Sequence, residues 1–564
     1  MNNLTWVREC RGLVVITLIL SIFFSYDLGI RSFVSPSEAR YVEIPREMVE
    51  TGDYITPRLN GLKYFEKPPL FYWLQAASIK AFSVNETSMR LWTLVFAVLG
   101  CLNIFIVGAS LHSIAAGLVS SALLATNVLY YAHSRVIVID IVFSTFLCGA
   151  LWCFFAAFVQ KNKHTKHRGK IITSMYALSA FACLTKGLIG VVLPGLVAFL
   201  WIAITKNWKK IPKMIYLPGI FAFLCIFLPW HLMVEYRNPG FSHFYFVVEH
   251  FLRYTTKMHD RYQSTWFFLP VLLAGLMPWT GFVLASIKNA WTDIRTRTNL
   301  YSENIFLFCW IFGILIFFSF SNSKLIPYIL PVIQPLALIT GISIVKSLES
   351  NKNDFNRAAW VNVAVGTVVM VGCLIIAATS FIPAMLRNSG ASLLLTALAC
   401  IFAISIIVLL AAIYEKYFKI SPTNALLIFV FLAANMMWTL NKISLHYQDV
   451  LKPSTKAMAS FIRLNKAAED LVFCYGYYYQ DLPVYLGSTI GIVNFVGELE
   501  FGANAEKGKK TTWTESEFWN LWNTTTKRIF LLLSRETYRK VFATKVGMHN
   551  ILNFDRHFIV ISNR

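Results

Sequence analysis

The sequence has few charged residues for its length. Asp, Glu, Lys and Arg make up 14% of the 564 residues, whereas 56% are hydrophobic and the mean hydropathy is +0.56. In an average soluble domain about a quarter of the residues are charged. This composition excludes a water-soluble globular protein and predicts an integral membrane protein.

Other signals are missing as well. The ten cysteines are scattered, almost all inside apolar segments, with no spacing typical of a disulfide framework or a zinc site. No internal repeat is visible, and the apolar segments carry few charges near their centres, where proton-coupled transporters and channels need them. A lipid flippase or transporter is therefore the weaker alternative. No RNA-binding motif accompanies the net charge of +22, so nucleic acid is not a predicted partner.

Long apolar segments dominate the first 442 residues. Each is long enough, or nearly so, to cross a bilayer as a helix. Thirteen such segments run over residues 12–30, 90–110, 114–132, 138–159, 171–187, 189–206, 213–234, 265–287, 303–321, 325–347, 358–382, 391–415 and 423–441.

Basic residues gather in alternate connections between these segments. The connections are 161–170, 206–213, 288–297, 346–357 and 416–419. Because Lys and Arg favour the cytoplasmic side, this pattern predicts a cytoplasmic N-terminus and explains most of the positive charge. An odd number of spans then places everything after residue 442 on the opposite, outer side.

The chain is expected to form two domains. Residues 1–442 form the transmembrane domain, with outer loops at 30–89 and 235–264. Residues 443–564 change character: short apolar runs at 471–474, 491–496, 528–533 and 557–561 alternate with helical patterns such as 515–522. This alternation predicts a small α/β domain.

The first outer loop concentrates charge beside the membrane. Such charges cost desolvation energy unless they pair or bind a charged ligand. The loop is therefore the predicted active-site loop, with an amphipathic helix along the interface and a turn over residues 63–67. Its charged residues are Glu38, Arg40, Glu43, Arg46, Glu47, Glu50, Asp53, Arg58, Lys63, Glu66 and Lys67.

Further candidates lie at the outer ends of spans. Asp140 either pairs with Arg135 or serves the site, and Lys186 is either a lipid anchor or a cation of the site. His250 and Arg253 are one helical turn apart, and Lys324 and Tyr328 sit in one turn. Each of these four also has a plain structural interpretation, as a packed histidine or an interfacial anchor.

Several stretches together resemble one family. Residues 36–48 (PSEARYVEIPREM), 61–73 (GLKYFEKPPLFYW), 248–254 (VEHFLRY) and 321–328 (SNSKLIPY) are similar to segments of the bacterial lipid A aminoarabinose transferases. These belong to the GT-C superfamily, which includes the protein O-mannosyltransferases. Residues 481–487 and 497–502 in the tail also look familial.

The resemblance implies a GT-C fold and a periplasmic active site in the bacterial inner membrane. It implies a donor sugar on undecaprenyl phosphate, a lipid A phosphate as acceptor, and 4-amino-4-deoxy-L-arabinose or galactosamine as the sugar. A polyprenyl-phosphate-dependent protein or glycan glycosyltransferase is the alternative.

The resemblance also assigns roles to single residues. The expected catalytic residues are Glu38, Asp140 and Lys67; the phosphate-binding residues are Lys67, Arg253, Tyr328, Lys324 and Arg40; Glu66 and His250 would hold a divalent metal, with zinc favoured.

The chain departs from the family pattern at one position. The family loop usually begins with an Asp-Glu pair, whereas this chain has Ser37 before Glu38. A general base is needed when an alcohol attacks, but a lipid A phosphate is already an anion near neutral pH. We therefore interpret Ser37 as compatible with a phosphate acceptor.

The topology gives the first testable prediction. Reporter fusions placed after residue 165 and after residue 450 should report opposite sides of the membrane, because an odd number of spans separates the N-terminus from the tail. Activity of a periplasm-specific and a cytoplasm-specific reporter at both positions measures this. Reporters on the same side would rule out the odd count.

Overall fold

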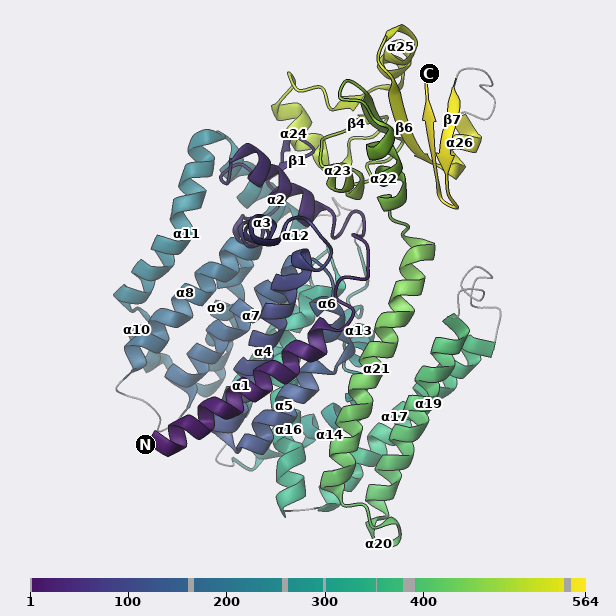
Figure 1. Ribbon diagram of the computed structural model, residues 1–564. Coiled ribbons are helices and arrows are strands. Elements are labelled where there is room, and N and C mark those ends of the chain that lie inside the picture. The colour runs from purple at the N-terminus through teal and green to yellow at the C-terminus, as the bar shows by residue number, and fades with distance from the viewer. Residues whose placement is uncertain are drawn as a thin grey trace. The chain divides into compact units, whose positions relative to one another are not determined.

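The computed structural model describes residues 3–160, 167–255, 262–297, 301–350, 352–378, 391–541 and 549–564 (Figure 1). The chain divides into two compact units. The helical unit comprises Met1–Leu28, Trp92–Leu232 and Ser242–His446. The loop–sheet unit comprises Gly29–Leu91, Met233–Phe241 and Tyr447–Arg564. The first outer loop therefore belongs with the C-terminal residues, far away in sequence.

Helices account for every apolar segment predicted above. In chain order they are α1 (Asn3–Ser25), α4 (Leu91–Leu111), α5 (Ile114–Ala125), α6 (Val128–Ser134), α7 (Ile139–Phe154), α8 (Arg168–Lys186), α9 (Ile189–Thr205), α11 (Leu217–Arg237), α13 (Phe268–Gly275), α14 (Thr280–Arg295), α15 (Tyr301–Ser319), α16 (Ile333–Ser350), α17 (Lys352–Ala378), α19 (Ala391–Ile413) and α21 (Pro422–Leu451). Between them lie the short helices η4 (His243–Leu252), α12 (Arg253–Thr255) and η5 (Ile326–Val332).

Two of the predicted segments are bent rather than straight. The axes of α5 and α6 differ by 67°, and those of α13 and α14 by 110°. Asn127 starts α6 anew by accepting the Tyr130 N–H at 2.9 Å. Within the described residues, eight helices meet the length and apolarity of a span, or up to ten if each bent pair counts once. The expected count of about thirteen stays a prediction.

In the helical unit, the span formed by η5 and α16 is 89% buried, and the span that begins with α7 is 78% buried. The Trp152 ring on α7 lies 4.6 Å from that of Trp310 on α15. Glycines let neighbouring helices approach: a Cβ on Gly108 of α4 would lie 2.9 Å from the Cα of Gly117 on α5. Such close approach through small residues is typical of helices packed in membranes.

The loop–sheet unit begins with α2 (Arg40–Thr51), a hairpin of β1 (Arg58–Leu59) and β2 (Leu62–Lys63), and α3 (Leu70–Phe82). Asn60 and Gly61 form the turn of the hairpin, with φ of 53° and 79°. A two-residue turn of this kind needs positive φ at both positions, which Asn and Gly tolerate best. The fully buried Asn60 side chain also bonds Ile490, donating to its carbonyl at 2.8 Å and accepting its N–H at 2.9 Å.

The C-terminal part of this unit is a six-stranded sheet with the order β5-β4-β3-β6-β8-β7. The strands are β3 (Leu471–Tyr475), β4 (Gly491–Val493), β5 (Thr512–Trp513), β6 (Ile529–Ser534), β7 (Asn550–Phe554) and β8 (Phe558–Ser562). The first four in that order run parallel, and β8 and β7 are added antiparallel.

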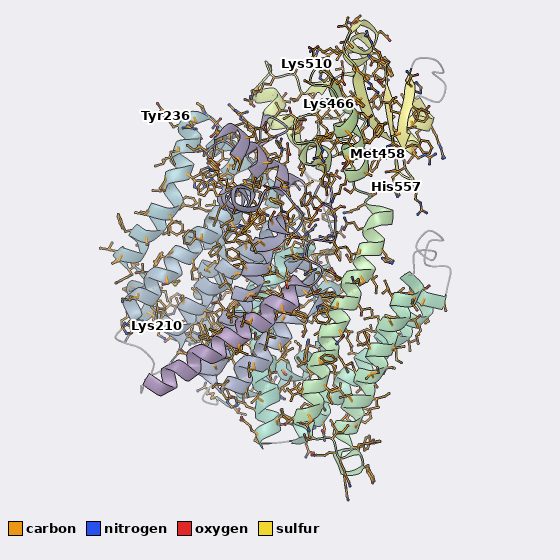
Figure 2. All side chains as sticks on the ribbon, in the orientation of Figure 1. Lys210, Tyr236, Met458, Lys466, Lys510 and His557 are labelled. Carbon is orange, nitrogen blue, oxygen red and sulfur yellow. The ribbon has the colours of Figure 1, made fainter. Side chains whose placement is uncertain are left out.

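Helices α22 (Lys456–Asn465), α23 (Asp481–Leu486), α24 (Glu500–Ala505), α25 (Glu515–Thr524) and α26 (Arg535–Val541) connect the strands. On α25, Phe518 and Trp522 pack on the sheet. Thr514 and Glu517 close a capping box at its start, where Lys510 pairs with Glu517 at 2.9 Å; Figure 2 labels Lys510 in this part of the chain. The predicted α/β domain is confirmed, and all four apolar runs coincide with strands.

Candidate functional site

The helix of the first loop is buried on both faces. On α2 the side chains of Tyr41, Ile44 and Met48 are buried, but so are Glu43 and Glu47. Segments far away in sequence cover the acidic face: Arg46 on α2 donates to the Gly487 carbonyl at 3.4 Å. The sequence predicted a helix lying along the membrane interface. The acidic face is buried in protein, which the pattern alone could not show, and the place of α2 along the interface stays a prediction.

Glu38 lies just before α2 and is fully buried. Its carboxylate accepts hydrogen bonds from Arg31 at 2.8 Å, from Arg90 at 3.0 Å and from the Val34 N–H at 3.2 Å. Arg90 is itself 1% exposed, so the buried carboxylate is compensated by two guanidiniums. This geometry favours a positioning role for Glu38, which was predicted to be catalytic.

Arg40 begins α2 and lies in a second network. Its Nη1 donates to the Tyr64 hydroxyl at 2.9 Å and forms an ion pair with Glu498. The Glu66 carboxylate lies 3.9 Å away. Gln480 donates to the other oxygen of Glu498 at 2.6 Å. Arg40 and Glu66 were predicted site residues and the structure brings them together.

Lys67 follows Glu66 in the same loop. Its ammonium donates to the Glu66 carbonyl at 2.6 Å, and Pro68 and Pro69 separate it from α3. The predicted turn is thus confirmed for Glu66 and Lys67. Lys63 stands instead in strand β2.

A pair of buried carboxylates lies on α2. Glu43 accepts two hydrogen bonds from Arg46, at 2.6 and 2.7 Å, and Glu47 accepts the Gly61 N–H at 2.9 Å. Burial and the neighbouring Glu43 raise the pKa of Glu47 to about 8, although the Gly61 N–H and Arg46 act in the opposite direction. Glu47 therefore keeps its proton near neutral pH.

Asp140 and Lys186 form an ion pair in the helical unit. Asp140 stands in the first turn of α7 and Lys186 ends α8. The Lys186 ammonium also lies over the ring of Tyr328, 4.7 Å from its centroid. The structure thus brings Asp140 and Tyr328 to one cation. Arg135, the suggested partner of Asp140, instead donates to the carbonyls of Phe24 and Tyr26, so that pairing is wrong.

Lys324 is engaged by backbone rather than left open to a ligand. Its ammonium donates to the carbonyls of Ser321 at 2.6 Å and Gln263 at 2.9 Å, and the residue is 4% exposed. This arrangement ties the turn before η5 to the segment at Gln263. It favours an anchoring role over the predicted phosphate contact.

The remaining two predicted residues are placed only by their backbone. His250 lies in η4 and Arg253 starts α12, but their side chains lie outside the described part of the chain. Among the described residues, no group of three His, Cys, Asp or Glu is arranged to hold a metal. The predicted pair of Glu66 and His250 stays a prediction.

Sequence reasoning missed the residues that support this loop. It did not single out Arg31 and Arg90 as partners of Glu38, or Tyr64 as a partner of Arg40. It also did not single out Gln480 and Glu498 in the tail. Tyr64 lies inside the charged turn and could have been found there. Glu498 lies in the stretch 497–502 that resembles the family, but nothing local pairs it with Arg40, which is 458 positions away.

Comparisons with known proteins define the class first. Residues 12–245 match the dolichyl-phosphate-mannose-protein mannosyltransferase family, and residues 458–563 match the aminoarabinose transferase C-terminal domain. The fold agrees with the crystal structure of ArnT from Cupriavidus metallidurans bound to undecaprenyl phosphate. Here the TM-score is 0.83 at 24% identity, covering 100% of this chain and 99% of that one. The protein is a multi-pass membrane protein with the GT-C fold.

Curated relatives of the chain are named as aminoarabinose transferases. The chain is 31% identical over 323 residues, 57% of each chain, to the undecaprenyl phosphate-alpha-4-amino-4-deoxy-L-arabinose arabinosyl transferase 2 of Sodalis glossinidius. It is 28% identical over 379 residues, 66% of each chain, to the enzyme of the same name from Proteus mirabilis. These alignments span about two thirds of the relatives' length or less. The chain thus matches both family models and is similar to the aminoarabinose transferases.

Glu47 gives a prediction for pH dependence. The unfolded chain releases this proton near its ordinary pKa of 4.5, whereas the folded protein holds it to about 8. The folded state therefore loses stability as pH rises from about 4.5 to about 8. Glu47→Gln cannot ionise, so its melting temperature should fall less over this range than that of the wild type, measured on detergent-solubilised protein.

A control for this prediction lies on the same helix. Glu50 also pairs with Arg46, at 2.5 Å, but its side chain is 60% exposed. Glu50→Gln removes a negative charge at the same guanidinium without removing the buried carboxyl group, so its curve should parallel that of the wild type. A Glu47→Gln curve parallel to the wild type would contradict the assigned proton.

Proposed function

We propose that the protein is a glycosyltransferase that moves an amino sugar, 4-amino-4-deoxy-L-arabinose, from undecaprenyl phosphate to a phosphate of lipid A. The observation that carries this proposal is the match of the C-terminal part to the aminoarabinose transferase domain, together with relatives named for this donor. The charged first loop supports it, with Arg40 at the start of α2 and Glu66 and Lys67 in the turn before α3.

In this reaction the bond between the sugar C1 and the undecaprenyl phosphate oxygen breaks. A lipid A phosphate oxygen forms the new bond to C1, and undecaprenyl phosphate leaves with the electron pair. Negative charge thus grows on the leaving phosphate, and fixed cations and donors in a dry site stabilise it strongly. Lys67 and Arg40 in the first loop would do so, and the same role is proposed for Arg253 and Tyr328.

The sugar needs groups that hold its amine and hydroxyls. Asp140, neutralised by Lys186, offers carboxylate oxygens at the outer end of α7. Glu38 would hold the loop in its conformation rather than contact the sugar, because its oxygens already pair with Arg31 and Arg90. Ser37 fits the phosphate acceptor, since an anionic nucleophile needs no general base.

The membrane setting follows from the same proposal. Undecaprenyl phosphate and lipid A are membrane lipids, so the proposed place is the bacterial inner membrane with the site facing the periplasm. The alternatives are galactosamine in place of aminoarabinose, and a protein or glycan acceptor in place of lipid A. Mass spectrometry of lipid A distinguishes them.

A divalent metal held by Glu66 and His250, with zinc favoured, is part of the proposal but not of the mechanism above. One carboxylate and one imidazole suit zinc with water completing its shell. The Glu66 carboxylate is also 3.9 Å from Arg40, whose guanidinium would compete with a cation for it.

Metal content tests this directly. Purified wild-type protein should contain about one equivalent of metal by elemental analysis, and His250→Ala should contain clearly less, since the imidazole supplies one of two protein ligands. His133→Ala is the control, because His133 already bonds the Leu129 carbonyl at 2.7 Å. Metal absent from the wild type, or unchanged in His250→Ala, would return His250 to a structural role.

The transferase proposal is tested by mass spectrometry of lipid A. Cells that express the wild type should carry the mass of one added amino sugar on a lipid A phosphate, and Lys67→Ala should lose this product almost completely, because the cation beside the leaving phosphate is gone. Ser37→Ala, a few residues before α2, should keep most of it.

Protein levels measured by immunoblot control for misfolding. A wild type that leaves lipid A unmodified while a purified donor sugar is transferred to another acceptor would favour the protein or glycan alternative. Normal lipid A modification by Lys67→Ala would remove Lys67 from the site.

A further inference from the structure

Glu498 connects the C-terminal part of the chain to the first residue of α2. It stands in η6 (Gly497–Leu499), between the sheet strand β4 and helix α24. One carboxylate oxygen takes the ion pair from Arg40 and lies 3.5 Å from the Tyr64 hydroxyl, while the other accepts from Gln480 at 2.6 Å.

Gln480 returns the network to the first loop. Its side-chain carbonyl accepts the Ser35 hydroxyl at 2.6 Å, and its backbone N–H donates to the same Ser35 oxygen at 2.8 Å. Gln480 and Ser35 thereby hold the Glu498 carboxylate in place, in addition to its ion pair with Arg40. A carboxylate fixed in this way sets the direction of the group that it binds.

The two edges of the Arg40 guanidinium differ in their hydrogen-bond partners. Nη1 serves Glu498 and Tyr64, whereas Nε is buried and has no hydrogen-bond partner among the described residues. The hydroxyl of Tyr72, on α3, is likewise buried and unpartnered in this part of the chain. Tyr41 links the two residues, since the guanidinium lies 5.7 Å above its ring and that ring stacks on Tyr72 at 5.9 Å.

Leaving a buried donor unpaired is destabilising, so such donors normally face a water or a ligand. A guanidinium Nε–H and a phenol O–H both donate, and the guanidinium is always charged. Together they suit an oxygen of an anionic group rather than a cation or an apolar surface.

We propose that Glu498 is a positioning residue that holds Arg40 by its Nη1 so that the Nε side of the guanidinium faces the substrate's phosphate. This inference rests on the proposed function, in which that phosphate belongs to the undecaprenyl phosphate donor. Because the guanidinium is planar and rigid, fixing one edge fixes the other. The C-terminal domain then completes the site through Arg40 without touching the substrate itself.

The chain supplies a matched control in Glu506. This residue also joins the tail to the first loop, through two contacts of 3.0 Å with Arg58 and one of 3.0 Å with the Lys63 N–H. The two side chains are similarly buried, 16% exposed for Glu498 and 13% for Glu506. In the first loop, the described partners of Glu506 all lie in the β1–β2 hairpin, so it holds the tail to the loop without orienting a proposed phosphate ligand.

A double-mutant cycle on full-length protein in detergent tests the proposal. The variants are Glu498→Ala, Arg40→Ala and the double mutant, with Glu506→Ala as control. Binding of undecaprenyl phosphate, kcat/KM for transfer and the melting temperature are measured for each.

Glu498→Ala should weaken binding and lower kcat/KM about tenfold. The same change should have little effect, under twofold, once Arg40 is already Ala. Glu506→Ala should lower the melting temperature but change kcat/KM per folded molecule less than twofold.

Glu498→Gln provides a second test of the proposal if Glu498→Ala does not fold. Gln retains one acceptor oxygen of the same reach, so it should recover part of the binding lost in Glu498→Ala, or by itself show a smaller loss than Arg40→Ala. Two results would overturn the proposal: an undiminished effect of Glu498→Ala or Glu498→Gln in the Arg40→Ala background, and tighter binding after Glu498 is removed, which would make Glu498 a competitor for Arg40.

The failure of this inference is distinguishable from failure of the proposed function. If the wild type modifies lipid A but both Glu498 variants match it in binding and kcat/KM, the positioning role is wrong and the function stands. If the wild type transfers no sugar, the function is wrong. The binding cycle with undecaprenyl phosphate alone, which needs neither sugar nor acceptor, still decides whether Glu498 acts through Arg40.

Discussion

Neutralisation of buried carboxylates is the constraint on which the loop–sheet unit depends. Glu38, Glu43 and Glu47 are all less than 5% exposed, and an unpaired buried carboxylate is strongly destabilising. Each charge is compensated in a different way. Glu38 pairs with Arg31 and Arg90, Glu43 accepts hydrogen bonds from Nε and Nη2 of Arg46, and Glu47 keeps its proton. These contacts fix the backbone on both sides of Arg40, with Glu38 before it and Glu43 and Glu47 after it on α2.

The C-terminal part does more for this loop than cover it. The two segments are joined at several points, among them Asn60 with Ile490, Arg58 with Glu506, and Arg40 with Glu498. Gly502 fits because a Cβ there would lie 2.5 Å from the Lys63 carbonyl. The C-terminal part thus holds the loop through particular side chains rather than through general apolar burial.

Local patterns in the sequence predicted what local physics determines. Apolar length gave the helices, and alternating short runs gave strands β3, β4, β6 and β8. The Asn60-Gly61 pair was a hairpin signal that the charged surroundings obscured. In contrast, the burial of the acidic face of α2 and the partners of Arg40 depend on residues more than 400 positions away. A periodic pattern reports the polarity of a helix face, but not whether water or another segment satisfies it. Lys186 was noticed, yet nothing local could choose Asp140 over a lipid as its partner.

The interleaved make-up of the loop–sheet unit has a consequence for biosynthesis. Its first segment, Gly29–Leu91, leaves the ribosome early, whereas Tyr447–Arg564 is made last. Domains generally fold as units, and contacts across long sequence separations form late because closing the intervening chain costs entropy. During translation of everything in between, the buried acids of α2 have no tail to cover their face and stay hydrated. The enzyme's loop can therefore reach its final form only after chain termination, so a ribosome that stops early releases an inserted membrane protein whose loop lacks these contacts.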